Sequence, residues 1–258
     1  MKKIRFSMAL LVILVLCFTT NSFCSDNRES EVQDYIGKLH SNNIIVRITA
    51  AKLISNSAIA SSSLYDAVEK NLLKYLHATN LSKMHIDEAS WLCKALASSG
   101  DYRYQSTLQK VIDSIDNNKI KRYAKQSLEN LDEYSERNKI VNSTALYDEA
   151  LSPEENRIAN MIRADNVNIK RDGAKIVFRS SKSSPEIFNI IEVELLANYA
   201  KNSLEHDHVD TISWLCKALA SSGDPQYRAT LRKISRTSSN WKIQNFAKES
   251  LNALPVSE

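Results

Sequence analysis

Apolar residues recur three and four positions apart through most of this chain, with polar residues between them. Trp91, Leu92, Ala95 and Leu96 show this spacing, and so do residues 120–131. The spacing places apolar side chains on one face of a helix. Glycine and proline, four of each, are too sparse for a turn-rich β-sandwich. The pattern therefore predicts an all-α protein built from amphipathic helices.

One sequence occurs twice. SWLCKALASSGD fills positions 90–101 and 213–224, an offset of 123 residues. At this offset 25 of the 45 columns from 87 to 131 are identical, and weaker matches extend the register upstream to Glu31 and Glu154. The chain is predicted to be a tandem duplication of a unit of about 100 residues. We expect a leader at 1–24, repeat units at 25–131 and 154–258, and a linker at 132–153.

Six helices are predicted in each copy, which makes about six antiparallel helix pairs in all. In the first copy they cover 31–40, 44–57, 63–77, 87–98, 102–115 and 119–131. Ser152, Ser184 and Asp224 each precede a proline, which suits the first position of a helix. Gly100 and Gly223 stand where a helix end favours a left-handed residue. In the linker, a poorly matched helix is expected around 144–151.

One segment favours a different structure when taken alone. Residues 169–178 could form a β-hairpin, because Asp172-Gly173 is a strong turn signal. The matching segment of the first copy, 45–55, has no turn pair and prefers a helix. The register between the copies therefore predicts a helix here too.

Four segments share a polar or acidic turn, then a basic residue, then a small residue and an aliphatic one. They are 42–53, 116–128, 165–176 and 239–251. This pattern resembles the second helix of HEAT repeats. The resemblance implies a right-handed α-α superhelix whose second helices line a concave, protein-binding surface. Two departures are visible, since no proline kinks the first helices and the pair at 63–98 lacks the basic turn pattern.

The N-terminus has the features of a secretory signal peptide. Basic residues precede an apolar run at 8–18, and a small-residue pattern ends at Cys24. The run is shorter than the roughly 20 residues that span a bilayer, so we expect cleavage near Cys24 and Ser25 and no stable membrane insertion. A lipid anchor on Cys24 is the alternative, although Phe23 and Asn21 do not fit lipoprotein processing. The protein is therefore expected to be periplasmic or secreted.

Removing the leader changes the charge of the chain. Three of the 34 basic residues leave with it and none of the 30 acidic ones, so 31 basic residues remain against 30 acidic. A nearly neutral chain gives no general reason to expect nucleic acid or an anionic membrane as the partner. The four glycines are isolated, which excludes a dinucleotide fingerprint or a P-loop.

Two cysteines, Cys93 and Cys216, remain after cleavage. Linear stacking would separate them by roughly 25–30 Å, at the usual 8–10 Å between packed helices. A disulfide tolerates about 7 Å between Cα atoms. We therefore expect two buried free thiols, with a bridge between molecules as the alternative.

Basic residues near the starts of the second helices are the first candidate site. They are Arg47, Lys121, Arg122, Lys170 and Lys242. One interpretation is a ladder of ion pairs and hydrogen bonds with neighbouring turns. The other is a basic stripe that binds an acidic partner segment.

The tryptophans differ in their expected roles. Trp91 and Trp214 have helical spacing beside leucine and alanine, and we expect them in the core, with binding hot spots as the alternative. Trp241 has Asn118 in its column of the first copy and lies at an inter-helix turn. It is the best single candidate for an exposed contact residue.

Histidine chemistry is the weaker alternative. His206 and His208 could contribute to a metal site, but zinc sites normally have three or four ligands at set spacings. Asp207 or Asp210 as the cap of a helix explains this segment equally well. The sequence has no Gly-x-Ser-x-Gly elbow, and neither of the two remaining cysteines has a histidine close in sequence, so no cofactor or catalytic residue is predicted.

These observations lead to an exported, non-enzymatic scaffold that binds a partner protein and is monomeric. An exported enzyme or metal-binding protein on a helical scaffold is the second hypothesis. A secreted effector or adhesin that targets host proteins is the third.

Overall fold

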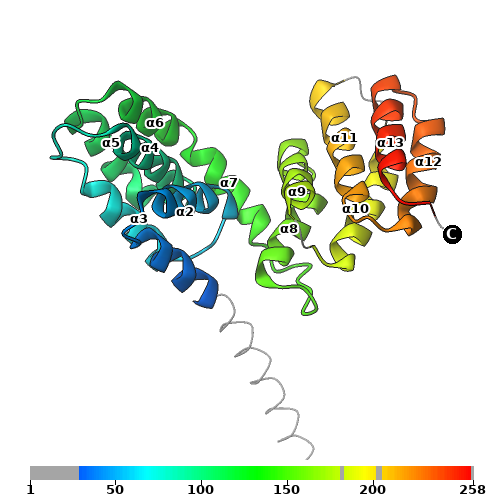
Figure 1. Cartoon of the computed structure of the whole chain (residues 1–258), viewed down its shortest axis with the longest axis horizontal. Coiled ribbons are helices and arrows are strands. Elements are labelled where there is room, and N and C mark those ends of the chain that lie inside the picture. The colour runs from blue at the N-terminus through cyan, green and yellow to red at the C-terminus, as the bar shows by residue number, and fades with distance from the viewer. Residues whose placement is uncertain (1–28, 181–182, 202–204, 257–258) are drawn as a thin grey trace, which may run out of the picture. The chain divides into compact units, whose positions relative to one another are not determined.

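The computed structural model describes residues 29–180, 183–201 and 205–256, so the predicted leader at 1–24 lies outside the described residues. The chain divides into two compact units, Met1–Asn138 and Lys139–Glu258, hereafter unit 1 and unit 2. The described part of the chain is helical and contains no strand (Figure 1). None of its helices is long and apolar enough to span a membrane.

Unit 1 is built from three helix pairs. Residues 29–39 pair with α2 (Ile44–Ser57), α3 (Ser62–Leu73) pairs with α4 (Lys83–Ala97), and α5 (Gln105–Ser114) pairs with α6 (Asn118–Glu129). A 3₁₀ turn at Tyr102–Tyr104 leads into α5. The second helices form one layer, because α4 packs between α2 and α6, while α3 contacts α5 in the other layer.

Unit 2 repeats this arrangement. Its pairs are α8 (Pro153–Arg163) with α9 (Val167–Arg179), α10 (Pro185–Asn198) with α11 (His206–Ala220), and α12 (Arg228–Thr237) with α13 (Trp241–Ala253). A 3₁₀ turn at Pro225–Tyr227 precedes α12. Here α11 packs between α9 and α13, and α8 contacts α10. The predicted all-α fold of antiparallel helix pairs is confirmed within each unit, and residues 169–178 are helical rather than a hairpin.

Matched contacts tie the first helices together in both units. The Tyr104 hydroxyl donates to Asp66 at 2.7 Å, and the Tyr227 hydroxyl donates to Asn189 at 2.9 Å. Thr107 likewise donates to Glu69, as Thr230 does to Glu192. Each of these pairs is related by the offset of 123 residues. The duplication is therefore visible in tertiary contacts as well as in sequence.

Each unit has its own hydrophobic core with a cysteine inside it. Cys93 and Cys216 are fully buried and free, which confirms the predicted free thiols. Burial raises the pKa of both thiols to about 12. A thiol that stays protonated and has no solvent access is chemically inert.

The linker differs from the prediction. A helix, α7, runs over Leu131–Val141, while 144–151 forms turns instead of the expected helix. The α7 helix is fastened to unit 1, because Asn138 Nδ2 donates to the carbonyl oxygens of Ser98 and Ser99 at 2.8 and 2.9 Å. Its backbone passes close to Gly100, where an added Cβ would lie 2.6 Å from the Cα of Ser135.

Candidate functional site

Four second helices begin at an asparagine cap. The Asn43, Asn117, Asn166 and Asn240 side chains each accept a hydrogen bond from a backbone N–H in the first turn of the helix. Such a cap satisfies donors that have no partner within the helix. The polar turn that the sequence shows in four segments therefore has a structural purpose, which is to fix where each second helix begins.

In unit 1 the basic residue of this turn forms an ion pair with a buried glutamate. Arg47 Nε and Nη2 donate to the two carboxylate oxygens of Glu88 at 2.7 and 2.8 Å, and Nη1 donates to the Ser41 carbonyl oxygen at 2.8 Å. Glu88 is only 2% exposed. A guanidinium that holds a carboxylate through two parallel bonds is among the strongest pairings available. Arg47 thus locks the turn before α2 to α4.

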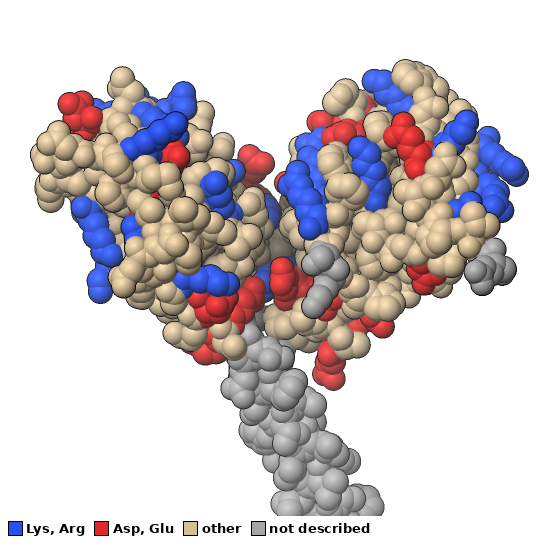
Figure 2. All heavy atoms as spheres, in the orientation of Figure 1, with Lys and Arg blue, Asp and Glu red and all other residues tan. Residues whose placement is uncertain are grey.

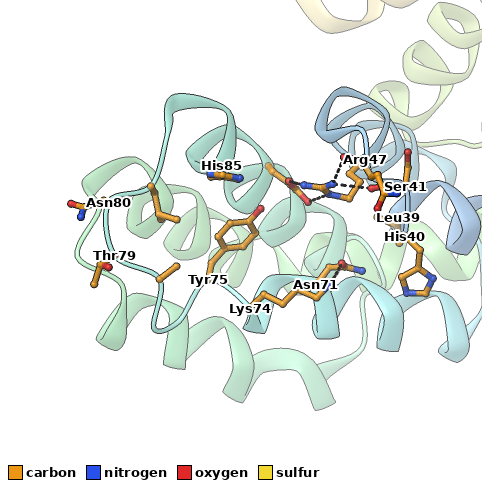
Figure 3. Close-up of a pocket in the computed structure, with 14 residues that line it drawn as sticks. Leu39, His40, Ser41, Arg47, Asn71, Lys74, Tyr75, Thr79, Asn80 and His85 are labelled. Carbon is orange, nitrogen blue, oxygen red and sulfur yellow. Dashed lines mark hydrogen bonds and ion pairs between the residues drawn. The ribbon is translucent and has the colours of Figure 1, made fainter.

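This ion pair lies in the wall of a cavity of about 520 Å³ (Figure 3). Tyr75 lies beside the pair, and burial, together with a hydrogen bond to Glu88, raises the pKa of its hydroxyl. His40, Lys74 and His85 add polar groups to the lining. Lys74 Nζ donates to the Asn71 side chain at 2.7 Å. The strongest polar groups of the cavity are already paired with one another.

A serine and a histidine also meet at this cavity. Ser82 Oγ lies 3.0 Å from His85 Nδ1, but the same oxygen caps α4 by accepting from the His85 backbone N–H. Within the described residues, no carboxylate is hydrogen-bonded to this ring. A nucleophilic serine normally needs a base that a third group orients. The pair therefore acts as a helix cap.

Unit 2 places a buried cation in the same column as Arg47, but its carboxylate comes from a different helix. Lys170, 7% exposed, donates to Glu194 on α10 at 2.6 Å. The column of Glu88 holds Thr211, and the column of Glu194 holds Asn71. A second hydrogen bond reaches Glu194 from Asn198 at 3.2 Å. The cation in this column is thus neutralised in both units, by carboxylates from different columns.

The face of the second helices in unit 1 carries a tryptophan between two lysines. Lys52 Nζ lies 5.2 Å from the centre of the Trp91 ring, and Lys94 Nζ lies 5.4 Å from it. Tyr123 packs its ring edge-on against Trp91 at 6.3 Å. Trp91 is half-buried rather than fully in the core. We call Lys52, Trp91 and Lys94 the lysine–tryptophan cluster of unit 1.

Unit 2 has the same cluster, formed by Lys175, Trp214 and Lys217. The two ammonium groups lie 5.4 and 4.7 Å from the ring centre of Trp214. Phe178, which is exposed, packs edge-on against this ring at 5.7 Å. A cation within about 6 Å of an aromatic ring is attracted to its face. All three positions of one cluster match those of the other at the offset of 123 residues.

These clusters are local features rather than parts of a broad charged field. On the face drawn in Figure 2, Lys and Arg side chains are spread over both units instead of gathering in one patch. A half-buried tryptophan with two cations over it combines apolar area with charge in one place. Such a combination suits contact with a protein segment that offers both apolar and acidic side chains.

Unit 2 also has a groove next to its cluster, between the N-terminal turns of α11 and α13. It measures about 550 Å³. We call it the Trp241 groove, and it is lined by His206, Val209, Asp210, Ser213, Asn240, Trp241, Lys242, Asn245, Phe246 and Glu249. Trp241 is 66% exposed, as expected for a contact residue at a turn.

The predicted basic residues fall into two groups. Arg47 and Lys170 form ion pairs inside their units, which agrees with the ladder interpretation at these two positions. Arg122 and Lys242 are exposed beside the aromatic rings of Tyr123 and Trp241. Lys121 is half-buried at the start of α6. A partner-binding role for any of the five stays a prediction.

The histidine segment is arranged differently from the expectation. Glu205, not Asp207 or Asp210, occupies the cap position of α11. Both aspartates instead accept from Arg171 Nη1, at 3.0 and 3.3 Å. The prediction was wrong because both carboxylates pair with Arg171 on α9.

His206 and His208 do not converge on one point. The His206 side chain is exposed, while His208 is buried, since residues two apart on a helix point to nearly opposite sides. Burial and the nearby Lys201 lower the pKa of His208, although a hydrogen bond with the Asn198 backbone opposes this effect. Among the described residues, no three His, Cys, Asp or Glu side chains could together hold a metal ion.

The four lysines of the two clusters are not among the site residues predicted from the sequence. Lys94 and Lys217 belong to the twelve-residue repeat, and Lys52 and Lys175 share a column as well. Their identity in both copies was a usable signal. Their role depends on two neighbouring helices bringing lysines to one ring, which the sequence of a single helix does not show.

No protein-family model matches this chain, and no curated protein matches it in sequence. Solved structures do match, at low similarity. An engineered protein is 15% identical, with 86% of this chain and 96% of that chain covered and a TM-score of 0.31. Human deoxyhypusine hydroxylase is 10% identical over 89% and 97% of the two chains, with a TM-score of 0.34. A computationally designed armadillo repeat protein for modular peptide recognition is 13% identical over 86% and 99%, with a TM-score of 0.31. Function must therefore be argued from this chain's own residues.

Proposed function

We propose that this chain is an exported, non-enzymatic scaffold that binds a partner protein through the exposed faces of its second helices. The observation that supports it is the lysine–tryptophan cluster, which occurs at the same place in both units. Packing alone does not require two lysines over a half-buried ring. Tryptophan is among the residues enriched at interface hot spots.

Charge also favours a particular kind of partner. Each cluster brings two ammonium groups to one apolar ring. Asp172 lies 3.9 Å from the Lys175 ammonium group, whereas within the described residues Lys52, Lys94 and Lys217 form no ion pair. A partner carboxylate would gain from these cations, and an apolar side chain would cover the rest of the ring. The proposed partner segment is thus acidic with apolar side chains between the acids.

A charge-reversal experiment tests the proposed face. The variant Lys52→Glu/Lys175→Glu changes one cluster lysine in each unit. Its matched control is Lys110→Glu/Lys233→Glu, which changes two exposed lysines on α5 and α12, also related by the offset of 123. Both variants alter the net charge equally. Capture of a partner from the envelope or secreted fraction, with photo-crosslinkers at the same positions, should fail only in the cluster variant.

Two outcomes contradict this assignment. Equal capture by the cluster variant and its control would show that the second-helix face is not the binding surface. A crosslinked product that forms from positions 110 and 233 but not from 52 and 175 would place binding on the first helices instead.

Export is a separate part of the proposal and has its own test. The support is the basic, apolar and small-residue order of residues 1–24. Cell fractionation and N-terminal sequencing should find a chain that begins near Ser25 outside the cytoplasm. An intact N-terminus in the cytoplasmic fraction would remove export and leave the scaffold proposal unchanged.

A further inference from the structure

The Trp241 groove has a counterpart in unit 1. A groove of about 580 Å³ lies between the N-terminal turns of α4 and α6 and is lined by Lys83, Ile86, Asp87, Asp116, Asn117, Asn118 and Lys119. Six of these residues occupy the same columns as lining residues of the Trp241 groove, from His206 through Lys242. The duplication thus supplies an internal control, because the two grooves differ in a few identifiable residues.

In unit 1 two lining residues of the groove form an ion pair with each other. Lys119 Nζ on α6 is paired with the Asp87 carboxylate on α4. Lys119 and Asp87 therefore satisfy each other. Neither is left to attract a partner's charge.

In unit 2 the matching lysine has lost its carboxylate. The column of Ile48 holds Arg171, which takes Asp210 at 3.3 Å and Asp207 at 3.0 Å. Asp210 is the counterpart of Asp87. Within the described residues, Lys242 pairs with no carboxylate, and its ammonium group lies 5.9 Å from the ring centre of Trp241.

Aromatic side chains complete the difference. Trp241 replaces Asn118, and Phe246 replaces Tyr123. Lys217 Nζ lies 4.6 Å from the Phe246 ring and also belongs to the lysine–tryptophan cluster. The groove is therefore continuous with that cluster. Because Phe246 and Lys217 correspond to Tyr123 and Lys94, the difference lies in Trp241 and Lys242: unit 2 presents an exposed tryptophan beside this lysine, where unit 1 presents Asn118 and the Lys119–Asp87 ion pair.

We infer that the Trp241 groove is a specificity pocket that receives an apolar or aromatic side chain of a partner segment flanked by carboxylates. This inference rests on the proposed function and names the part of the face that selects the partner. Trp241, Phe246 and Val209 would contact the inserted side chain. Lys242 and Lys217 would pair with the flanking carboxylates, since Arg171 already neutralises Asp210, and Glu249 is the remaining acid of the lining.

The test uses three blocked tripeptides with the full-length mature protein. Acetyl-Glu-Phe-Glu-amide is the matching probe, acetyl-Lys-Phe-Lys-amide reverses the charge, and acetyl-Glu-Ser-Glu-amide removes the apolar group. Binding is followed by the NMR signal of the Trp241 indole N–H, which is assigned by its loss in Trp241→Asn. A few such contacts give a dissociation constant of about 1 mM, so titration to about 5 mM suffices.

The expected result is a saturable shift of the Trp241 signal with the first peptide only. Trp241→Asn, which installs the unit 1 residue, should abolish the changes at neighbouring signals such as Phe246. Lys242→Gln should weaken binding about fivefold, because one charge-assisted contact is lost. Lys119→Gln, at the matching position of unit 1, should leave binding unchanged.

Other results overturn the inference. These are equal shifts with the lysine peptide, binding that survives Trp241→Asn, or no shift at the highest concentration with a folded protein. Thermal unfolding of each variant supplies the control for folding, and Trp241 is exposed enough to be replaced safely. If the cluster lysines are needed for partner capture but the tripeptides do not bind, the groove inference fails and the proposed scaffold stands. If the tripeptides bind and no partner is captured, the groove inference stands and the proposed scaffold fails.

Discussion

Units 1 and 2 solve the same electrostatic problem with different residues. Both place an ion pair with one buried member at the first turn of a second helix: half-buried Arg47 with buried Glu88 in unit 1, and buried Lys170 with Glu194 in unit 2. Unit 1 takes the neutralising carboxylate from α4, while unit 2 takes it from α10. A buried charge without a partner is very costly, so the pairing persists through divergence while the identity of the partner changes. A comparison of matching columns therefore shows where a cation is placed, but it does not show which residue supplies the neutralising carboxylate.

Moving the carboxylate between columns is the strongest test of this comparison. Glu88→Thr installs the unit 2 residue and leaves Arg47 without its carboxylate. We expect unit 1 to lose about 3 kcal/mol of unfolding free energy, the lower end of the range for a buried pair stripped of one partner, because the Arg47 side chain that remains is 20% exposed. Adding Asn71→Glu, which places an acid in the column of Glu194, should restore more than half of the loss.

The measurement is urea unfolding read by hydrogen exchange, with the amides of unit 2 as the internal reference. A loss below about 1 kcal/mol would mean that the pair contributes no more than an exposed one. The presence of an ion pair in both units would then not reflect a large contribution to stability.

A matched pair of glycines gives a smaller effect that sharpens the comparison. Gly100 and Gly223 both have left-handed backbones, with φ of +66° and +67°. An alanine pays about 1 kcal/mol for this conformation in either place. At Gly100 its Cβ would also meet the Ser135 backbone, whereas at Gly223 nothing lies within 4 Å.

We therefore expect Gly100→Ala to cost about 2–3 kcal/mol and Gly223→Ala about 1 kcal/mol, since crowding adds to the strain only where α7 passes. Thermal unfolding of the two single variants measures the difference. Equal losses would show that α7 moves away without cost.

The smallest expected effect is a pH dependence confined to unit 2. Burial lowers the pKa of His208 below 6.5, so the unfolded chain binds this proton more readily than the folded one. Stability contributed by the neutral ring is present above pH 6.5 and falls as the pH drops through 6.5 toward the folded-state pKa. His208→Gln should remove this part of the dependence when unfolding free energies are compared between about pH 8 and pH 5. The control is His85→Gln, the exposed counterpart in unit 1. A wild-type slope retained in His208→Gln would contradict the assignment.

Much of the fold follows from the sequence because the duplication checks each local pattern. Residues 169–178 illustrate this, since the register with 45–55 correctly outweighed the Asp172-Gly173 turn signal. The α7 helix is not predicted from the sequence, because this check is missing there. Residues 132–141 lie outside the two matching copies, and the helix is held by contacts to distant carbonyl oxygens at Ser98 and Ser99.

Less of the candidate site was predictable. Trp241 was identified because its column holds asparagine in the first copy, and its exposure agrees with the expectation. Residue type alone predicts Asp207 or Asp210 as a cap, although Arg171 on another helix determines their contacts. Contacts between helices depend on side-chain direction and reach, and these cannot be read from one helix at a time.

The two buried cysteines can report how often each unit opens. Cys93 and Cys216 react with a thiol reagent only during the moments when their surroundings open, because the closed state offers neither access nor thiolate. Labelling followed by peptide mass spectrometry would therefore record two opening frequencies from one molecule. Labelling in the presence of a ligand would then show whether binding to one unit also changes how often the other unit opens.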